Sequence, residues 1–430
     1  MTKNPIMRVL VIALIGANTV AVAMRVFSVA SHAVMADTMV VLRDFVGADV
    51  SFFDVGPYCA TSTQNLSCAR AASYFPELHR GIHTVLSTDS VRRNVALIRA
   101  MPEFQAADVA IGFFPVCASV QLLLELTNDM PCIMMQTIQF DSFAWDNCGH
   151  FSACVNAMRA FSALSASRTT LAASTRVFSE WLRYFTGIDT EIVVPHTAAH
   201  LAGHVGLYTG AGDRVVVCPK KRMSNVNQWI VDALLSRNVT AELLSPDNQY
   251  YSHDFLPARA RAVVFVSYSW APTTLSEVYA QNIPIFVPSP TLVWQWIEQQ
   301  TDESQKRAVL YECFQPQFES LDTKPFTTGA AFQSPRQSPH HWSRDMFMEW
   351  FPLHVQYELP FVRVFDSYDD LAAQVRALGA RELAGISAQM SSFNSAQRVH
   401  SARAWSRMLN SSVCKFHRHE NAAAKNLSCA

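Results

Sequence analysis

Two short apolar segments joined by a polar turn and a single helix constrain the fold of this chain more than any other feature. The segment 261–290 has the sequence RAVVFVSYSWAPTTLSEVYAQNIPIFVPSP. Its apolar parts, 262–267 and 283–288, are typical of buried strands. Between them lie a turn at 268–274 and the first part of a helix at 275–281. Apolar strands separated by one short helix predict a βαβ unit in a buried parallel sheet.

An acidic residue stands at a chemically useful place in this unit. We expect Glu277 to lie in the first turn of the helix, just beyond the C-terminal edge of the first strand. Ligands of open α/β sheets bind at that edge, and a helix N-terminus there favours anions because its free N–H groups and its macrodipole point outward. The alternative is an ordinary structural acid that the helix dipole stabilises.

The same stretch resembles the donor-binding segment of the GT-B glycosyltransferase superfamily. In that family a strand leads through a turn to a helix carrying an acid, and a strand similar to IPIFVP follows. The resemblance implies that Glu277 binds ribose or sugar hydroxyls of a nucleotide sugar, and that Thr273, Thr274 and Ser276 line the phosphate side. Ser269 stands where many retaining members carry a further Glu, so this chain departs from their pattern there.

Length and charge limit the class of protein. The 430 residues suffice for two or three domains of ordinary size. Half are apolar and the formal net charge is −1, without a Lys/Arg stripe, so we expect no nucleic-acid partner. No glycine fingerprint follows a predicted strand, which disfavours a dinucleotide oxidoreductase. No Asp-x-Asp motif occurs either, so the resemblance implies the metal-independent class, with a nucleotide sugar as co-substrate and no metal cofactor.

The chain alternates strands and helices in two successive series. Predicted strands of the first series are 25–32, 48–55, 107–115, 131–140 and 191–198, with helices at 35–45, 118–127, 154–173 and 175–188. The second series has strands at 213–219, 239–246, 262–267 and 283–288, a helix at 225–236, and a final strand and helix within 361–378. This pattern predicts an α/β protein with two Rossmann-like, doubly wound parallel-sheet domains.

The GT-B resemblance assigns a role to each half, with a cleft between them. It implies an N-terminal acceptor domain at 25–200 and a C-terminal donor domain at 212–390. A segment rich in Pro, Ser, Gln and His at 315–344 is expected to be a loop insertion, and 391–430 a C-terminal helix with a polar tail.

The N-terminus has the layout of a targeting signal. Lys3 and Arg8 precede the apolar run 9–24, which Gly16 and Asn18 interrupt. A run of this length fits a signal peptide or a short signal-anchor, and its positive flank would leave the body of the protein in the lumen. The alternative is that MRVLVIALIGAN forms the first strand of a cytosolic domain.

A secretory-pathway location follows from reading residues 1–24 as signal peptide or anchor. The protein would then be secreted or a type II membrane protein of the ER or Golgi lumen, touching the membrane only if the segment stays uncleaved. Glycosylation sequons are consistent with this compartment; they start at Asn65, Asn238, Asn410 and Asn426.

Ten cysteines permit disulfides in an oxidising lumen. Cys59 and Cys68 flank a polar loop, and Cys148 and Cys154 lie close in sequence, so either pair is a candidate disulfide. Three others lie in apolar runs and are expected to be buried thiols: Cys117, Cys132 and Cys218.

Glycosyl transfer needs stabilisation of the departing diphosphate and a base for the acceptor hydroxyl. Lys220, Lys221 and Arg222 follow the strand 213–219, where the resemblance places diphosphate-binding cations; the alternative is a solvated basic turn. His32 ends the first predicted strand, where the resemblance implies the general base. An imidazole titrates near neutrality and suits that role, and the alternative is a loop or capping histidine.

Other polar residues are weaker candidates. Asp141 follows the strand 131–140 and, with Thr137 and Gln139, is a candidate acceptor contact. Histidines near the predicted interdomain turn and in the insertion are expected to be structural or on the surface: His196, His200, His340 and His341.

These features predict a glycosyltransferase that moves a sugar from a nucleotide-sugar donor to a hydroxyl acceptor on a glycan, a protein or a lipid. A second hypothesis is a catalytically degenerate GT-B-fold protein that binds glycans or acts as a scaffold. Ser269 in place of an acid, and the lack of an evident acidic partner for His32, point to that alternative. The fold alone does not decide between them.

Overall fold

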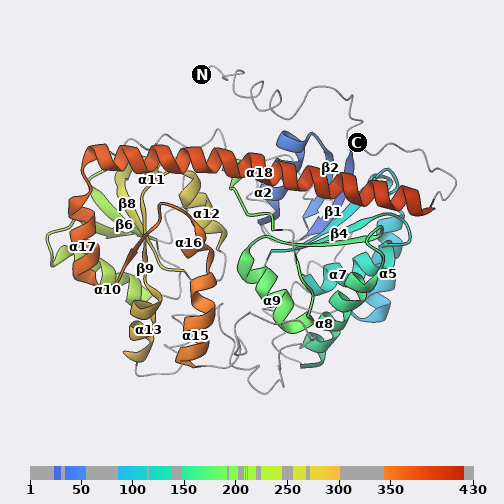
Figure 1. The fold of residues 1–430 in the computed structure, drawn as a ribbon, viewed down its shortest axis with the longest axis horizontal. Helices are drawn as coiled ribbons and strands as arrows, with labels where there is room; N and C mark the ends of the chain where they lie inside the picture. Colours follow the sequence, from blue (N-terminus) through green and yellow to red (C-terminus); the bar gives the residue numbers. More distant parts are fainter. Residues whose placement is uncertain are drawn as a thin grey trace. The chain divides into compact units, whose positions relative to one another are not determined.

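The chain consists of two compact α/β units. The structure, a computed structural model, describes residues 24–30, 34–54, 86–113, 116–137, 148–190, 193–201, 208, 210, 212–218, 224–244, 255–267, 272–300 and 343–420. The first unit comprises Met1–His200 and Ala396–Ala430, and the second comprises Leu201–Ser395. A five-stranded sheet forms the centre of each unit (Figure 1).

The first sheet is parallel throughout, with strand order β2-β1-β3-β4-β5. Its strands are β1 (Arg25–Ala30), β2 (Asp49–Asp54), β3 (Val109–Gly112), β4 (Cys132–Gln136) and β5 (Thr169–Ala173). Its helices before the second unit are α2 (Val34–Val40), the π-helix η1 (Val41–Val46), α5 (Thr88–Arg99), α6 (Pro102–Gln105), α7 (Val116–Leu126), α8 (Cys148–Ala163) and α9 (Arg176–Thr186).

Both faces of this sheet are covered, as in a doubly wound domain. Successive strand residues point to opposite faces: Val26 joins the hydrophobic cluster formed with α2 and η1. Its neighbour Phe27 lies on the other face, with its ring centroid 5.3 Å from that of Phe104 in α6. Burial on both faces explains why the strands are almost continuously apolar.

The end of the chain completes the first unit. Helix α18 (Ala380–Glu420) is continuous, and its residues from Ala396 onward belong to the first unit. Trp405 and Met408 of this helix are buried in the same cluster as Val26, and the Trp405 ring lies 6.4 Å from that of Phe113. The first sheet therefore needs the last helix to close one of its faces.

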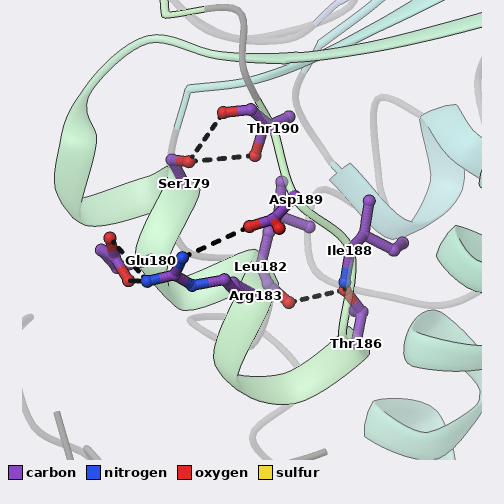
Figure 2. Close-up of polar contacts among 8 residues, drawn as sticks. All are labelled: Ser179, Glu180, Leu182, Arg183, Thr186, Ile188, Asp189 and Thr190. Carbon is purple, nitrogen blue, oxygen red and sulfur yellow. Dashed lines mark hydrogen bonds and ion pairs between the residues drawn. The ribbon is translucent and has the colours of Figure 1, made fainter. Parts of the chain in front are cut away.

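The chain leaves α9 along a fixed path, which Figure 2 shows. Gly187 ends the helix with a φ of 75°, a left-handed conformation that glycine adopts without strain. The Ile188 N–H donates to the Thr186 hydroxyl at 3.1 Å, and the Ser179 hydroxyl donates to the Thr190 carbonyl at 3.1 Å. Arg183 pairs with Glu180 at 2.9 Å. These contacts direct the chain towards the loop that carries His196.

The second sheet is also parallel, with strand order β10-β9-β8-β6-β7. Its strands are β6 (Arg214–Cys218), β7 (Ala241–Leu243), β8 (Ala260–Phe265), β9 (Ile285–Pro288) and β10 (Arg363–Phe365). The helical elements between η3 (Ala199–Leu201) and α18 are α10 (Ser224–Leu235), α11 (Phe255–Arg259), α12 (Thr273–Ala280), α13 (Pro290–Glu298), α15 (Arg344–Trp350), η5 (Phe351–Leu353), α16 (Val355–Glu358) and α17 (Tyr368–Ala377).

Two predicted elements of the first unit are wrong. The segment 154–173 is not one helix, because α8 ends at Ala163 and Thr169–Ala173 is strand β5. Pairing with β4 along its whole length outweighs the helical tendency of its small residues. The predicted strand 191–198 is represented, among residues 193–198, only by an isolated parallel bridge between Val193 and Ala173.

The disulfide predictions also need correction. Cys117 of α7 is bonded to Cys154 of α8, with Cα atoms 5.0 Å apart, so Cys117 is not a thiol and Cys154 does not pair with Cys148. Cys148 and Cys154 are six residues apart on one helix, which corresponds to about 9 Å along its axis and is too far for a disulfide. Cys132 and Cys218 are buried free thiols, as predicted.

Several predictions lie outside the described residues. These are residues 1–23 of the targeting segment, the candidate pair Cys59 and Cys68, and residues 315–342 of the insertion. Within the part of the chain that the structure describes, no helix has the length and apolarity needed to cross a membrane.

Candidate functional site

Both sheets share one strand order, which marks where ligands bind. Numbered in chain order within each unit, the strands run 2-1-3-4-5 in both. In such sheets the order reverses between the first and third strands, and the crevice at their carboxyl ends is the usual ligand site. This switch point lies at the ends of β1 and β3 in the first unit, and of β6 and β8 in the second.

The most informative sequence segment reaches the switch point of the second unit. Strand β8 is buried along Val263, Val264 and Phe265, and the chain leaves it at Ser267. Helix α12 then begins after Pro272, whose φ of −67° suits a helix start and whose side chain makes no capping hydrogen bond. The Leu275 N–H of this first turn donates to the Pro272 carbonyl at 3.0 Å. The dipole of a helix that begins at this edge favours an anionic ligand.

Helix α12 carries four of the seven predicted donor-binding residues: Thr273, Thr274, Ser276 and Glu277. It begins two residues earlier than the sequence suggested, because Pro272 is the N-cap and Thr273 is already helical. Glu277 therefore lies in the second turn and not in the first, which corrects our prediction. The favourable effect of the dipole fades beyond the first turn, so a purely dipole-stabilised acid is a weaker explanation of Glu277.

Six other predicted site residues fall outside the described part of the chain: His32, Gln139, Asp141, Lys220, Lys221 and Arg222. Their strands are described, however: Lys220 to Arg222 follow β6, the strand beside β8, and His32 follows β1.

A buried segment that the sequence did not single out packs against the same edge of the second sheet. His354 Nδ1 lies 3.3 Å from the Ser267 hydroxyl, and the Tyr357 hydroxyl donates to the Pro288 carbonyl at 2.7 Å. The ring of Phe351 lies 4.3 Å from that of His354. Burial lowers the pKa of His354 to about 3, so the imidazole is neutral at physiological pH.

Two carboxamides near this edge lack partners among the described residues. Both polar atoms of Asn227, in the first turn of α10 after β6, and of Gln356 in α16 are buried without a hydrogen bond. Each side chain is 0% exposed. An unsatisfied buried polar group costs about 1–3 kcal/mol, so each carboxamide needs a partner that the described residues do not supply.

Polar groups also line the carboxyl edge of the first sheet. Asp37 of α2, which follows β1, accepts hydrogen bonds from the backbone N–H of Thr197 at 2.7 Å and from that of Ala199. His196 Nδ1 lies 3.7 Å from a carboxylate oxygen of Asp37, and both side chains are 7% exposed. Thr137, a predicted acceptor contact, is buried just after β4.

Comparison with known proteins gives a likeness to solved glycosyltransferases. The glycotransferase of kitacinnamycin is similar over 90% of this chain and 99% of its own, with 10% identity and a TM-score of 0.41. The glycosyltransferase SnogD from Streptomyces nogalater is similar over 83% and 100%, with 13% identity and a TM-score of 0.33. No family model and no curated protein matches the chain.

Sequence reasoning missed His354 and Gln356 because their importance depends on contacts with distant segments. His354 and Ser267 are 87 residues apart, and no local pattern connects them. Gln136 was also missed, although the strand CIMMQ carries a signal: a polar residue closing an apolar strand lies at the carboxyl edge. In the described ranges, no group of three or more His, Cys, Asp or Glu residues forms a metal-binding cluster.

Proposed function

We propose that this chain is a glycosyltransferase that moves a sugar from a nucleotide-sugar donor to a hydroxyl acceptor on a glycan, a protein or a lipid. The observation that supports this most is the position of α12. The helix begins at the carboxyl edge of a parallel sheet, after the strand that borders the switch point, and it carries Glu277. Such an edge offers N–H groups for a diphosphate and a carboxylate for hydroxyls.

The donor would bind to the second unit. Glu277 would accept hydrogen bonds from ribose or sugar hydroxyls, while Thr274, Ser276 and the N-terminus of α12 would lie on the phosphate side. Lys220, Lys221 and Arg222 follow β6, whose end pairs with the end of β8, so their charges would stabilise the departing diphosphate.

The acceptor would bind to the first unit. His32 follows β1 at its switch point and would remove the proton of the acceptor hydroxyl. Asp141 follows β4 and would contact the acceptor. In this proposal the cations and the N–H groups stabilise the leaving group without a metal ion.

Binding of the donor tests the proposal. Wild-type protein is heated with UDP-, GDP-, ADP- and CMP-sugars, and the unfolding midpoint of the second unit is recorded. We expect one donor to raise the midpoint, since a ligand at 100 times its Kd stabilises by about 2.7 kcal/mol. The increase should disappear in Glu277→Gln, which loses a charged acceptor of hydroxyl hydrogen bonds.

The matched control is Asp345→Asn, which removes an exposed acid from the first turn of α15 in the same unit. It should keep the full response to the donor. If no donor stabilises the folded wild type, the transferase proposal fails and the degenerate glycan-binding alternative takes its place. An equal loss of response in both variants would show that Glu277 acts only through general electrostatics.

We also propose that the protein resides in the secretory pathway. The Cys117–Cys154 disulfide supports this, because such bonds persist in oxidising compartments and are rare in the cytosol. Peptide mapping of protein from its native cells under non-reducing conditions tests the location. Recovery of the two cysteines as free thiols would contradict it.

A further inference from the structure

Asn238 lies in an exposed turn between helix α10 and strand β7 of the second unit. Its φ of 57° is in the left-handed region. The Asn238 N–H donates to the Leu235 carbonyl at 3.0 Å, and the Val239 N–H donates to the Leu234 carbonyl at 3.0 Å, so the turn closes the end of α10. Asparagine adopts this conformation more readily than most residues, which explains the backbone here but not the residues that follow.

The residues after Asn238 complete an acceptor triplet for N-glycosylation, Asn238-Val239-Thr240. Val239 is buried, with 7% of its surface exposed, whereas Asn238 and Thr240 on either side of it are exposed. The amide that would carry a glycan and the hydroxyl that the triplet requires are thus both accessible in the folded protein.

The other sequon that lies within the described residues has a different environment. It begins at Asn410 in the helix α18, and its hydroxyl belongs to Ser412. Ser412 is 3% exposed, and its hydroxyl shares a hydrogen bond with the Thr170 hydroxyl of β5 at 2.9 Å. Folding of the first unit therefore makes this hydroxyl inaccessible, while the triplet at Asn238 stays exposed.

The surface beside Asn238 would benefit from a hydrophilic cover. Strand β7 begins directly after Thr240 and is the last strand of the described sheet, where it pairs with β6 alone. An open sheet edge is a template for aggregation. Leu235, in the same turn, is 50% exposed, the largest value among the exposed large apolar side chains of the described residues. A bulky, solubilising glycan at Asn238 would shield both features.

N-glycosylation requires that the chain enter the secretory pathway. The Cys117–Cys154 disulfide is the structural observation that supports this location, because such bonds persist in oxidising compartments. The inference about Asn238 therefore rests on the proposed location of the protein, and it is independent of the proposed transferase activity.

We infer that Asn238 is an N-glycosylation site, modified by the glycosylating enzyme of the secretory pathway. The co-substrate is an oligosaccharide linked to a lipid diphosphate. A bond forms between Asn238 Nδ2 and the anomeric carbon of the first sugar, and the bond from that carbon to the diphosphate oxygen breaks. The lipid diphosphate leaves with the bonding electron pair, and the displaced amide proton passes to a base of the glycosylating enzyme.

Mass spectrometry of the protein from its native cells tests the inference. Its peptides are treated with a peptide-N-glycosidase in heavy-oxygen water, which converts a glycosylated asparagine to an aspartate that carries the heavy isotope. We expect this label at Asn238 and not at Asn410. The state of the Cys117–Cys154 disulfide is measured on a non-reduced part of the same sample, so the location is tested separately from the glycan.

Thr240→Ala and Thr240→Ser form a matched pair of variants of the full chain, produced in the same cells. Both change one exposed side chain and leave Asn238 in its left-handed conformation. Thr240→Ala removes the hydroxyl that the triplet requires, so it should lose the label and the mass of one glycan, whereas Thr240→Ser should keep both. Thr240→Ala should also aggregate faster on heating than Thr240→Ser, because the edge of β7 loses its cover.

Three results would overturn the inference. An intact Cys117–Cys154 disulfide together with an unlabelled Asn238 would refute the glycosylation alone and leave the location standing. Free thiols at both cysteines together with an unlabelled Asn238 would refute the glycosylation and the location. A Thr240→Ala chain that keeps the wild-type glycan mass, or a label at Asn410 without one at Asn238, would show that the modified site lies elsewhere.

Discussion

Removing the Cys117–Cys154 disulfide should strongly destabilise the first unit. The bond joins α7 to α8 across a sequence separation of 37 residues. Closing a loop of 37 residues lowers the entropy of the unfolded chain by about 13 cal/mol/K, which corresponds to about 3.8 kcal/mol at 25 °C. That is a large part of the stability of an ordinary domain, about 5–15 kcal/mol.

The cross-link also predicts how two substitutions combine. Cys117→Ala and Cys154→Ala each abolish the bond, so each should lower the free energy of unfolding by about 3–4 kcal/mol. The double variant should lose about the same amount, because the bond can be lost only once. The assay is urea unfolding of the first unit, with hydrogen exchange in peptides from α7 and α8 to identify the unit that unfolds.

The control for this cycle is Cys132→Ala, which alters a buried free thiol in β4 of the same unit. Burial raises the pKa of the Cys132 thiol, so it carries no thiolate at neutral pH. The substitution should cost only the loss of one small apolar group, about 1 kcal/mol. Single variants that cost about 1 kcal/mol each, with a double variant equal to their sum, would refute the cross-link argument.

Two further predictions concern charge and close packing. Because burial lowers the pKa of His354 from 6.5 to about 3, the unfolded chain binds more protons between these values, and the second unit should lose stability as the pH falls below about 6.5. At pH 5 the loss amounts to about 2 kcal/mol, and pH-dependent urea unfolding of His354→Phe should lack it. A Cβ at Gly112 would lie 2.7 Å from a methyl carbon of Leu123. At Gly385 of α18, no described atom lies within 4 Å of the Cβ position, apart from the two chain neighbours and the adjoining helix backbone. Gly112→Ala should therefore lower the midpoint of unfolding, because overpacking lowers the free energy of unfolding by about 1–3 kcal/mol. Gly385→Ala should raise the midpoint, because alanine stabilises a helix by about 1 kcal/mol more than glycine does. Equal shifts in the two glycine variants would contradict the packing argument.

The sequence predicted those strands that consist of consecutive apolar residues. The runs 262–267 and 283–288 correspond to β8 and β9, because a parallel strand covered on both faces is apolar throughout. Strand β5 has the sequence TTLAA, which favours neither a helix nor a strand, and its pairing with β4 decides its conformation. That pairing is a tertiary contact, so no local pattern reveals it.

The candidate site was predictable only in part for the same reason. Local sequence places Glu277 on a helix that follows a strand, but the exact start of the helix depends on Pro272 as N-cap. The contact between His354 and Ser267, and the disulfide between Cys117 and Cys154, join segments that are 87 and 37 residues apart. Such pairs depend on how helices pack on a sheet, which the spacing of residues does not encode.

The two carboxyl edges differ in the groups that follow their strands. Strand order is the same in both units, so the sheets alone do not distinguish a donor side from an acceptor side. In the second unit, the edge beside β8 leads into the N-terminus of α12, whose N–H groups favour an anion such as a diphosphate.

In the first unit, helix α2 after β1 instead carries Asp37, whose carboxylate accepts hydrogen bonds from the backbone N–H groups of Thr197 and Ala199. In the transferase proposal, the anionic donor would therefore bind to the second unit and the acceptor to the first.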